Sequence, residues 1–562
     1  MTYALSSGIT GLQANQQMLD IAGNNLANIN TTAFKASRIT FEELLSQTLE
    51  QGSQPTDSVG GTNPKQIGSG VGVAGITPNT EQGSIVNTGS PLDMALEGAG
   101  YFVVSDGEKY LYTRAGAFGV DAEGYLVDPS TGSRVQRIGL TGELDGFQVA
   151  GDSSIRVPYD VALPAKATSE ISISGNLSAD ATGASLAQVL TSSLRYTYDG
   201  GREATEATEL DQLNQFSGGS EADGQLAAGE TGTIAIAGYH ADGSAFSSGL
   251  SFTVDSTTTL GDLIDHLNTN VLDGATASLI NGRVRITDDQ TGYSKSDISL
   301  SYTGTGTLST PPYFEVTTVG GDEVKNVNIA IYDSQGGKHV LSAALVRTDA
   351  VNTWDMVLTS VTGNIGNISP ENRRISGLAF NAQTGAFAGI PATETAEFTI
   401  TFGNDTSHAQ TIGLSLGTTG SFDGLTQFAG NSTAVAREQD GYEAGNLSAV
   451  SVNGDGVLIG AFSNGIKKDI AALQVGLFNN PAGLQGVGGG YYAPSANSGS
   501  AVATQAMRSG AGSIHGGALE KSNADVATEF VNMIQAQNGF QANARTIRVA
   551  TDILRELTSL IR

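Results

Sequence analysis

Apolar residues recur every seven positions in the first thirty residues of the chain and again in its last forty. The N-terminal row consists of Leu5, Leu12, Leu19 and Leu26, with Ile9 between its members. The C-terminal row consists of Val526, Met533, Phe540, Ile547, Leu554 and Ile561, and Phe530 begins the row between its members. A repeat of seven places apolar side chains along one narrow stripe of a helix. The pattern therefore predicts one helix at each end of the chain.

The two stripes indicate helices that need partners. Each stripe is narrower than the apolar face of an ordinary core helix, and an isolated helix of about 30 residues is only marginally stable in water. We therefore expect the apolar rows to be assembly contacts, buried against each other or against other chains. Gln16 and Gln537 interrupt the rows. They could form a polar pair that fixes the register of a coiled coil, or they could simply face solvent.

Between the ends, the apolar residues no longer follow a helical spacing but occur in short runs separated by glycine. Asparagine and threonine crowd residues 24–37, where the first helix should stop. Residues 38–49 return to a helical pattern, and residues 51–72 are rich in Gly, Ser, Pro and Asn, which predicts a linker or an extended arm. Short β runs follow up to the last helix, with one helical pattern at 259–271. The chain is thus predicted to be a multidomain, mostly β protein with a terminal helical coiled-coil domain.

We expect the domains to be nested, each built from an outgoing and a returning segment around the outer β domains. They are a terminal helical domain with a linker arm at 1–70 and 519–562, an inner β domain at 71–160 and 432–518, an outer β domain at 161–188 and 318–431, and an inserted outermost domain at 189–317. The insertion is polar, acidic and rich in Thr, Ser and Gly, which sets it apart from its surroundings.

Composition narrows the possible partners. The formal net charge is −28, and almost all of it lies between the two terminal segments, which are themselves nearly neutral. A strongly acidic surface argues against nucleic acid or an anionic membrane as a partner. The chain has no cysteine, no signal-peptide pattern and no run of about 18 apolar residues. We therefore expect no disulfide, no Sec-dependent export and no membrane insertion.

Residue patterns for catalysis or cofactor binding are missing from the sequence. The five histidines lie far apart, without Cys, Asp or Glu at metal-ligand spacing. The glycine-rich stretch 67–75 lacks the Lys and Ser/Thr and the strand-to-helix context of a phosphate loop. Acidic pairs such as Asp288 and Asp289 are more typical of solvated turns than of a general acid and base. We therefore predict a protein that is not an enzyme and that has no catalytic residue, cofactor or metal.

Three blocks of sequence carry a resemblance to a known family. They are NNLANINTTAFK at 24–35, GAGYFVV with YTRAGAFGVDAEGYLV within 98–127, and GALEKSNADVATEFVNMIQAQNGFQANARTI at 517–547. Together they resemble the axial proteins of the bacterial flagellum, the family of rod, hook and hook-associated proteins. The family motif is matched at Asn24, Asn25, Leu26, Ala27, Asn28, Thr31, Phe34, Lys35, Ser522 and Asn523. Ala33 stands where the family usually has glycine, and Gly539 and Phe540 replace a polar or charged residue and a tyrosine.

The middle of the chain resembles the hook-type members of this family. IYDSQGGKHVL and Trp354, within 331–354, carry this likeness together with NLSAVSVNGDGVLIGAFSNG at 446–465. The resemblance implies a structural subunit that polymerises into a curved hollow tube, a universal joint that transmits torque from rod to filament. Its implied partners are other copies of the chain, the distal rod protein, the hook cap, the hook–filament junction protein and the flagellar export apparatus. Its implied place is the extracellular hook of the flagellar basal body, reached through the flagellar type III channel.

Two other functions stay open at this point. The chain could be a distal rod or hook-associated axial protein, although rod proteins are about half as long. It could instead be a secreted β-rich adhesin, which the acidic Thr/Gly-rich insertion suggests and the terminal heptads argue against.

Overall fold

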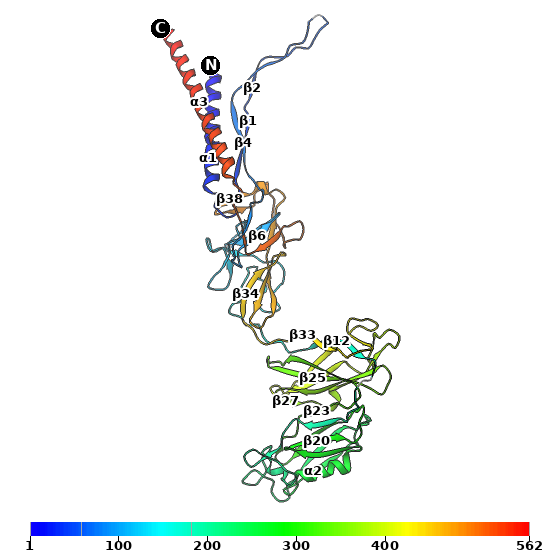
Figure 1. The fold of residues 1–562 in the computed structure, drawn as a ribbon. Coiled ribbons are helices and arrows are strands. Elements are labelled where there is room, and N and C mark those ends of the chain that lie inside the picture. The colour runs from blue at the N-terminus through cyan, green and yellow to red at the C-terminus, as the bar shows by residue number, and fades with distance from the viewer. Residues whose placement is uncertain (1, 58, 181–182, 561–562) are drawn as a thin grey trace. The chain divides into compact units, whose positions relative to one another are not determined.

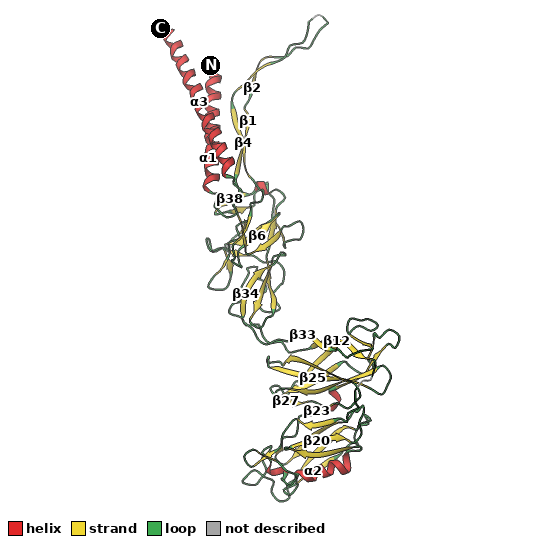
Figure 2. Ribbon diagram, in the orientation of Figure 1, coloured by secondary structure: helices red, strands yellow, loops and turns green. Residues whose placement is uncertain are grey.

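The computed structural model describes residues 2–57, 59–180 and 183–560, so Ile561 of the C-terminal apolar row lies outside the described residues. The chain divides into two compact units, Met1–Leu163 with Asn446–Arg562 and Pro164–Gly445. Strands make up most of the regular structure, and the two long helices lie at the chain ends (Figure 1, Figure 2). The predicted fold class, mostly β with terminal helices, is confirmed. The borders of the four nested domains stay a prediction.

The first unit begins and ends with the long helices α1 (Thr2–Ala27) and α3 (Val526–Leu560). They pack in antiparallel orientation, because Gly8 lies beside Ile547 while Asn25 lies beside Glu529. We call this pair the helix hairpin. The two glutamines that interrupt the apolar rows are exposed, and no hydrogen bond joins them among the described residues. None of the described helices is long and apolar enough to cross a membrane.

Local chemistry sets the inner ends of these helices. α1 stops in the Asn- and Thr-rich segment, where the Asn28 side chain donates to the Asn24 carbonyl at 2.9 Å. α3 starts after Asp525, whose carboxylate accepts a hydrogen bond from the Thr528 amide at 3.1 Å. Both inner ends lie next to the β part of the same unit (Figure 1).

The described residues of 37–78 form a two-stranded ribbon, which agrees with the extended arm predicted as one alternative for 51–72 but not with the helix predicted for 38–49. The strands are β1 (Ser37–Glu43), β2 (Ser46–Glu50), β3 (Lys65–Gly68) and β4 (Val71–Pro78). β1 pairs with β4 and β2 pairs with β3, both antiparallel, and bridges at Ser53–Thr62 and Thr56–Val59 continue the pairing. The helical prediction for 38–49 is wrong because Ile39 and Phe41 alternate with polar residues and 71–78 supplies the partner strand. Leu45 at the ribbon surface is 86% exposed.

The β part of the first unit interleaves segments from before and after the second unit. Its strands are β5 (Ile85–Asn87), β6 (Met94–Glu97), β7 (Tyr101–Ser105), β8 (Tyr110–Thr113), β9 (Gly119–Val120), β10 (Leu126–Val127), β11 (Arg134–Val135), β34 (Leu447–Val452), β35 (Val457–Phe462), β36 (Lys467–Ala472), β37 (Val475–Leu477), β38 (Gln485–Gly488), β39 (Tyr491–Ala493), β40 (Val502–Thr504), β41 (Ser513–Gly516) and β42 (Ala518–Glu520). One sheet has the order β38-β39-β8-β7-β11-β10-β9, with β37 and β40 attached, and β34-β35-β36 form another. β41 pairs with β6 and β42 with β5, so the returning chain closes on the outgoing chain.

The second unit contains two hydrophobic cores. Its elements are β12 (Glu170–Ser178), β13 (Val189–Ser192), β14 (Thr197–Tyr198), β15 (Arg202–Glu203), β16 (Phe216–Ser217), β17 (Gly232–Tyr239), β18 (Ser251–Val254), α2 (Leu260–His266), β19 (Ala275–Ile280), β20 (Arg283–Asp288), β21 (Asp297–Gly304), β22 (Thr307–Leu308), β23 (Phe314–Thr318), β24 (Val324–Tyr332), β25 (Lys338–Arg347), β26 (Thr353–Val361), β27 (Ile365–Asn367), β28 (Arg374–Phe380), β29 (Phe387–Gly389), β30 (Glu397–Phe402), β31 (Gln410–Ser415), β32 (Leu425–Phe428) and β33 (Val435–Gln439). The antiparallel sheet β24-β25-β26-β28-β29 and the mixed sheet β27-β30-β31-β12-β32 enclose a core around Trp354, which is fully buried. The other core lies between α2 and the strands of 189–317. A capping box at Thr259 and Asp262 starts α2.

Asp440 fixes the two segments that enter and leave the second unit. Its carboxylate accepts hydrogen bonds from the amides of Ser169 and Glu170, from the Ser169 hydroxyl and from the Lys166 amine, all within 2.9 Å. Burial acts to raise the pKa of Asp440, but these hydrogen bonds outweigh it and hold the pKa far below its usual range. An acid whose pKa falls on folding adds stability above its unfolded pKa and loses it as the pH falls.

We expect Asp440→Asn to lower the free energy of unfolding of the second unit by about 1–2 kcal/mol at pH 7. The deficit should shrink below about pH 4, because the wild-type carboxylate then begins to lose its advantage. Urea unfolding followed by Trp354 fluorescence measures both effects, and Asp349→Asn, at an exposed position, is the control. A deficit that stayed constant from pH 7 to pH 3 would contradict this assignment.

Candidate functional site: the junction of the chain ends

Residues from both ends of the chain converge at the base of the helix hairpin. Lys35, from the N-terminal motif, donates to the Glu520 carboxylate and to the Glu81 carbonyl, each at 2.7 Å. Glu520 also accepts from the Gly83 amide at 2.8 Å, and the Arg114 guanidinium lies 3.6 Å from its other oxygen. Lys35, Arg114 and Glu520 are each less than one-tenth exposed. We call these three residues the junction cluster.

The junction cluster places two cations around one buried carboxylate. Burial disfavours the charged amine and lowers the pKa of Lys35, although the hydrogen bond and charge of Glu520 act in the opposite direction. Removing one member of such a buried group leaves the others charged and poorly solvated, which costs about 3–5 kcal/mol. The cluster therefore fastens the segments around residues 35, 83, 114 and 520 to one another.

Two asparagine side chains of the motif blocks join the chain ends a second time. The Asn25 amide donates to Glu529 of α3 and to the Ser37 carbonyl, and its oxygen accepts from the Ser37 amide, all at 2.9 Å. The Asn523 oxygen accepts from the Ala36 amide at 2.8 Å, and its nitrogen donates to two carbonyls of the 79–81 loop at 2.9 Å. Each amide uses both its donor and its acceptor, and each has at least one partner at the other end of the chain. These residues are structural ties.

Of the remaining motif residues, Phe34 also joins the two ends, since its carbonyl accepts from the Asn523 amide at 3.2 Å, and the others lie around the junction. Leu26, Asn28, Phe34 and Ser522 are half-buried, while Asn24, Ala27 and Thr31 are exposed at the end of α1 and in the turn that follows. Thr31 donates to Asn28 at 3.1 Å, and the Ser522 hydroxyl accepts from the Ala524 amide at 3.2 Å. Sequence reasoning missed Arg114, Glu520 and Glu529. The sequence signal for these three residues is a charged side chain among small and apolar neighbours, within the blocks that resemble the family.

Ala33 adopts a left-handed backbone conformation inside the junction. Its φ is +55°, its side chain is buried, and its amide donates to the Glu520 carbonyl at 2.8 Å. Left-handed φ costs a residue with a Cβ roughly 1–2 kcal/mol, which glycine avoids. This explains why the family that the motif resembles usually has glycine here.

We expect Ala33→Gly to be neutral or stabilising, whereas glycine normally destabilises a buried alanine position. Ala36→Gly is the matched control, because Ala36 is also buried but its φ is not positive. The changes in the free energy of unfolding of the two variants should differ by about 1–2 kcal/mol in favour of Ala33→Gly. Denaturant unfolding of the full chain measures the difference. Equal destabilisation by both substitutions would show that Ala33 is not strained.

The apolar rows predicted as assembly contacts are only partly covered in the single chain. Half-buried members are Leu5, Leu12, Leu19, Leu26, Met533 and Ile547, and exposed members are Ile9, Val526, Phe530, Phe540 and Leu554. Neighbouring apolar residues of α3, among them Ile534 and Val549, are also exposed. The role of the rows in assembly stays a prediction.

The contact between α1 and α3 is made largely by small residues, which the sequence reasoning missed. Ala14, Ala22 and Ala536 are almost fully buried. A Cβ on Gly11 would lie 2.7 Å from the Asn543 amide nitrogen, and a Cβ on Gly539 would collide with the Asn15 side chain. Glycine at these positions lets the two backbones approach closely. The helix propensity lost at Gly539, about 1 kcal/mol, is thus offset by close packing.

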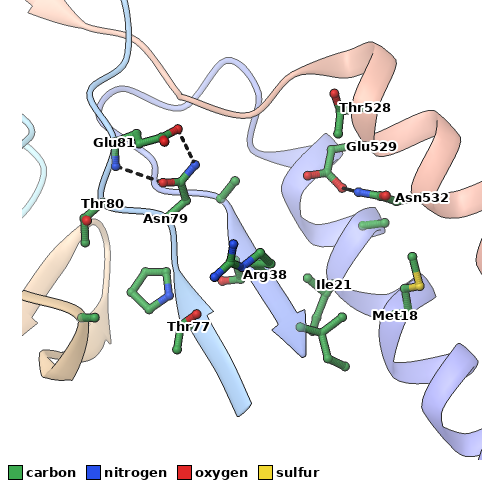
Figure 3. Close-up of a pocket in the computed structure, with 16 residues that line it drawn as sticks. Met18, Ile21, Arg38, Thr77, Asn79, Thr80, Glu81, Thr528, Glu529 and Asn532 are labelled. Carbon is green, nitrogen blue, oxygen red and sulfur yellow. Dashed lines mark hydrogen bonds between the residues drawn. The ribbon is translucent and has the colours of Figure 1, made fainter. Parts of the chain in front are cut away.

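A cleft of about 720 Å³ opens beside the junction, between α1, the base of the ribbon and the first turns of α3 (Figure 3). Its apolar lining includes Met18 and Ile21, and its polar lining includes Arg38 and Glu529. Glu529 is only 8% exposed and accepts hydrogen bonds from Asn25 at 2.9 Å and Asn532 at 3.4 Å. Among the described residues, no cationic side chain forms an ion pair with it.

The geometry of the junction favours structural connection over chemistry. Within the described ranges, no three His, Cys, Asp or Glu side chains gather as a metal ion would need. The buried polar residues of the junction cluster are engaged with each other and with backbone groups. The site can therefore hold helices and a ribbon in fixed relation to a β core.

Comparison with protein families matches four parts of the chain. Residues 5–35 match the family described as flagella basal body rod protein, and 95–179 match the flagellar hook protein FlgE/F/G D1 domain. Residues 309–442 match the flagellar basal body protein FlaE D2 domain, and 515–560 match the flagellar basal body rod FlgEFG protein C-terminal family. The junction described above lies within and between three of these segments.

Several relatives are similar to the chain from end to end. The flagellar hook protein FlgE of Borreliella burgdorferi and that of Treponema pallidum are each 29% identical to it, over the whole of both chains. The Escherichia coli flagellar hook protein FlgE is 25% identical over 99% of this chain and all of its own. A crystal structure of the Helicobacter pylori flagellar hook protein FlgE2 aligns with 76% of this chain and 99% of its own, with 18% identity and a TM-score of 0.39.

Proposed function

The chain belongs to the bacterial flagellar hook protein family and is a structural subunit of the hook, and from this premise we propose how its parts build the tube. The helix hairpins of many copies pack side by side and line the inside of a hollow, curved tube. The acidic β domains lie outside them. The tube is a universal joint that transmits torque from rod to filament.

The observation that carries this proposal is the exposed apolar surface of the helix hairpin. Phe530 is 48% exposed, Ile534 is 55% exposed and Val549 is 57% exposed, all on one helix. Fully burying an exposed side chain of this kind contributes roughly 1.5–3 kcal/mol, so burying the exposed half of each would contribute about 1 kcal/mol. Because the intrachain contact uses small residues, the large ones remain available for neighbouring copies. Apolar residues of the two rows thus stay exposed in the single chain, and polymerisation would bury them.

The acidic composition of the middle of the chain suits the outer layer. Charged and polar surfaces form wet, adaptable contacts, and a curved tube needs contacts that lengthen and shorten around the bend.

We propose no enzymatic role. We propose the same borders for the nested domains as the sequence predicts. At the ends of the tube, the proposed partners are the distal rod protein, the hook cap and the hook–filament junction protein. The flagellar export apparatus delivers the chain through the type III channel without a cleaved signal.

Electron microscopy of hook-basal bodies tests the proposal. Cells that make the full chain should show curved tubes, and cells that make a chain without residues 523–562 should show none, because α3 is then missing. Intact tubes from the shortened chain would refute the proposed role of the helix hairpin. Absence of tubes from the full chain would refute the proposed polymer.

A further inference from the structure

We propose that the projecting end of α3, residues 553–559, docks into the cleft beside the junction of a second copy of this chain, where Arg555 approaches the buried carboxylate of Glu529. This inference rests on the proposed function, since it names one contact by which copies join. It assigns a role to the cleft and to the last turns of α3.

The cleft contains a carboxylate that lacks a cation within its own chain. Glu529 is buried, and its carboxylate accepts hydrogen bonds from the side-chain amides of Asn25 and Asn532. A buried carboxylate is costly unless a cation or several hydrogen bonds compensate it. Arg38 lines the same cleft (Figure 3), but among the described residues it forms no ion pair with Glu529, so this carboxylate has no cation beside it. The Glu529 carboxylate is therefore suited to an occupant that brings a positive charge to it.

The rest of the cleft lining is suited to an apolar helix. Met18 and Ile21 of α1 form one wall, and Ile39 and Pro78 of the ribbon face them. An amphipathic helix with aliphatic side chains and one arginine would bury its apolar face here and place the guanidinium at the carboxylate. Arginine is well suited to a carboxylate that is partly desolvated.

The last turns of α3 have this composition and lack a partner in their own helix hairpin. Since Gly8 lies beside Ile547 in an antiparallel pair, the start of α1 lies level with about residue 553, and α3 continues beyond it (Figure 1). Ile553, Leu554 and Leu557 are 43%, 42% and 39% exposed. Arg555 stands among them.

One chain cannot make this contact with itself. Glu529 and Leu557 lie on the same helix, and at 1.5 Å per residue their separation along it is about 40 Å. The cleft and the projecting end are different surfaces at opposite ends of the helix hairpin. Contact between two different surfaces is heterologous, and it repeats from copy to copy into a helical polymer instead of closing as a dimer. A tube needs such a contact.

Disulfide trapping in assembled tubes tests the proposal, because the native chain has no cysteine. In tubes made from Ile21→Cys/Leu557→Cys, mild oxidation should give a ladder of covalent multimers, since each copy would be joined to the next. The single variants Ile21→Cys and Leu557→Cys should give no ladder. Tubes of the double variant that form normally but yield no ladder would overturn the docking while leaving the proposed polymer intact.

A second measurement covers the case in which the double variant does not assemble. Arg555→Gln should raise the concentration of free chain in equilibrium with tubes about tenfold, whereas Arg545→Gln, on the same helix but before the projecting end, should change it less than twofold. Equal effects of both substitutions would overturn the assignment of Arg555. Failure of the wild-type chain to form tubes would instead refute the proposed function.

Discussion

Replacing Gly11 by leucine is expected to separate the two long helices and abolish tube formation, while both β regions stay folded. Gly11 is buried where α1 meets α3, and even a single added carbon would lie 2.7 Å from the Asn543 side chain. A leucine adds three more carbons in the same place. Overpacking of this kind costs about 1–3 kcal/mol, which is enough to open a contact that depends on small residues. Electron microscopy of hooks and limited proteolysis of the free chain measure the result.

Gly23 supplies the matched control for this prediction. It lies in the same helix, and a Cβ added there would meet nothing within 4 Å. Gly23→Leu gains the same helix propensity, about 1 kcal/mol, without pushing the helices apart. We expect this variant to keep the protease resistance of α3 in the free chain. If Gly11→Leu formed normal hooks, the close approach of α1 and α3 would not be required for assembly.

The sequence predicted both helices correctly but not the contact between them. A repeat of seven in apolar residues identifies a helix because it depends only on the local sequence of that helix. Which face meets the other helix depends on residues with little apolar signal, such as Gly8, Gly11 and Ala536, which lie between the backbones. Small residues are informative only once a partner is known, so the partner face could not be read from the heptads.

The ribbon and the junction cluster show the same limit. Residues 38–49 contain both helical and alternating spacing, and only the pairing of β1 with β4 decides in favour of strands. Lys35 was recognised from the family motif, but its partner Glu520 lies 485 residues away. The family motif thus identified one residue of several contacts, while the partner residue is brought near it only by the fold.

Loss of Arg373 is expected to be among the most destabilising single changes in the second unit, at about 3–5 kcal/mol. Arg373 is 1% exposed, and its guanidinium donates to the Asp297 carboxylate and to the Phe314 carbonyl. Burial raises the pKa of Asp297, and the charge of Arg373 acts against that rise. In Arg373→Met the carboxylate would stay buried without its cation. Urea unfolding followed by the fluorescence of Trp354, the only tryptophan, reports on this unit directly.

Two further variants separate the ion pair from the packing around it. Arg373→Met/Asp297→Leu should recover most of the lost stability, because two apolar groups can replace a buried ion pair at little cost. A single buried charge without its partner is costly, which is why Arg373→Met alone destabilises. The deficit of Arg373→Met alone should shrink as the pH falls from 7 to 5, since an acid with a raised folded pKa gains stability when it is protonated. Arg195→Met, which breaks an exposed pair with Glu203, should cost less than about 1 kcal/mol. Since Asp297 belongs to β21 and Arg373 immediately precedes β28, a large coupling between them would mean that the strands of 189–317 and the sheet around Trp354 unfold together.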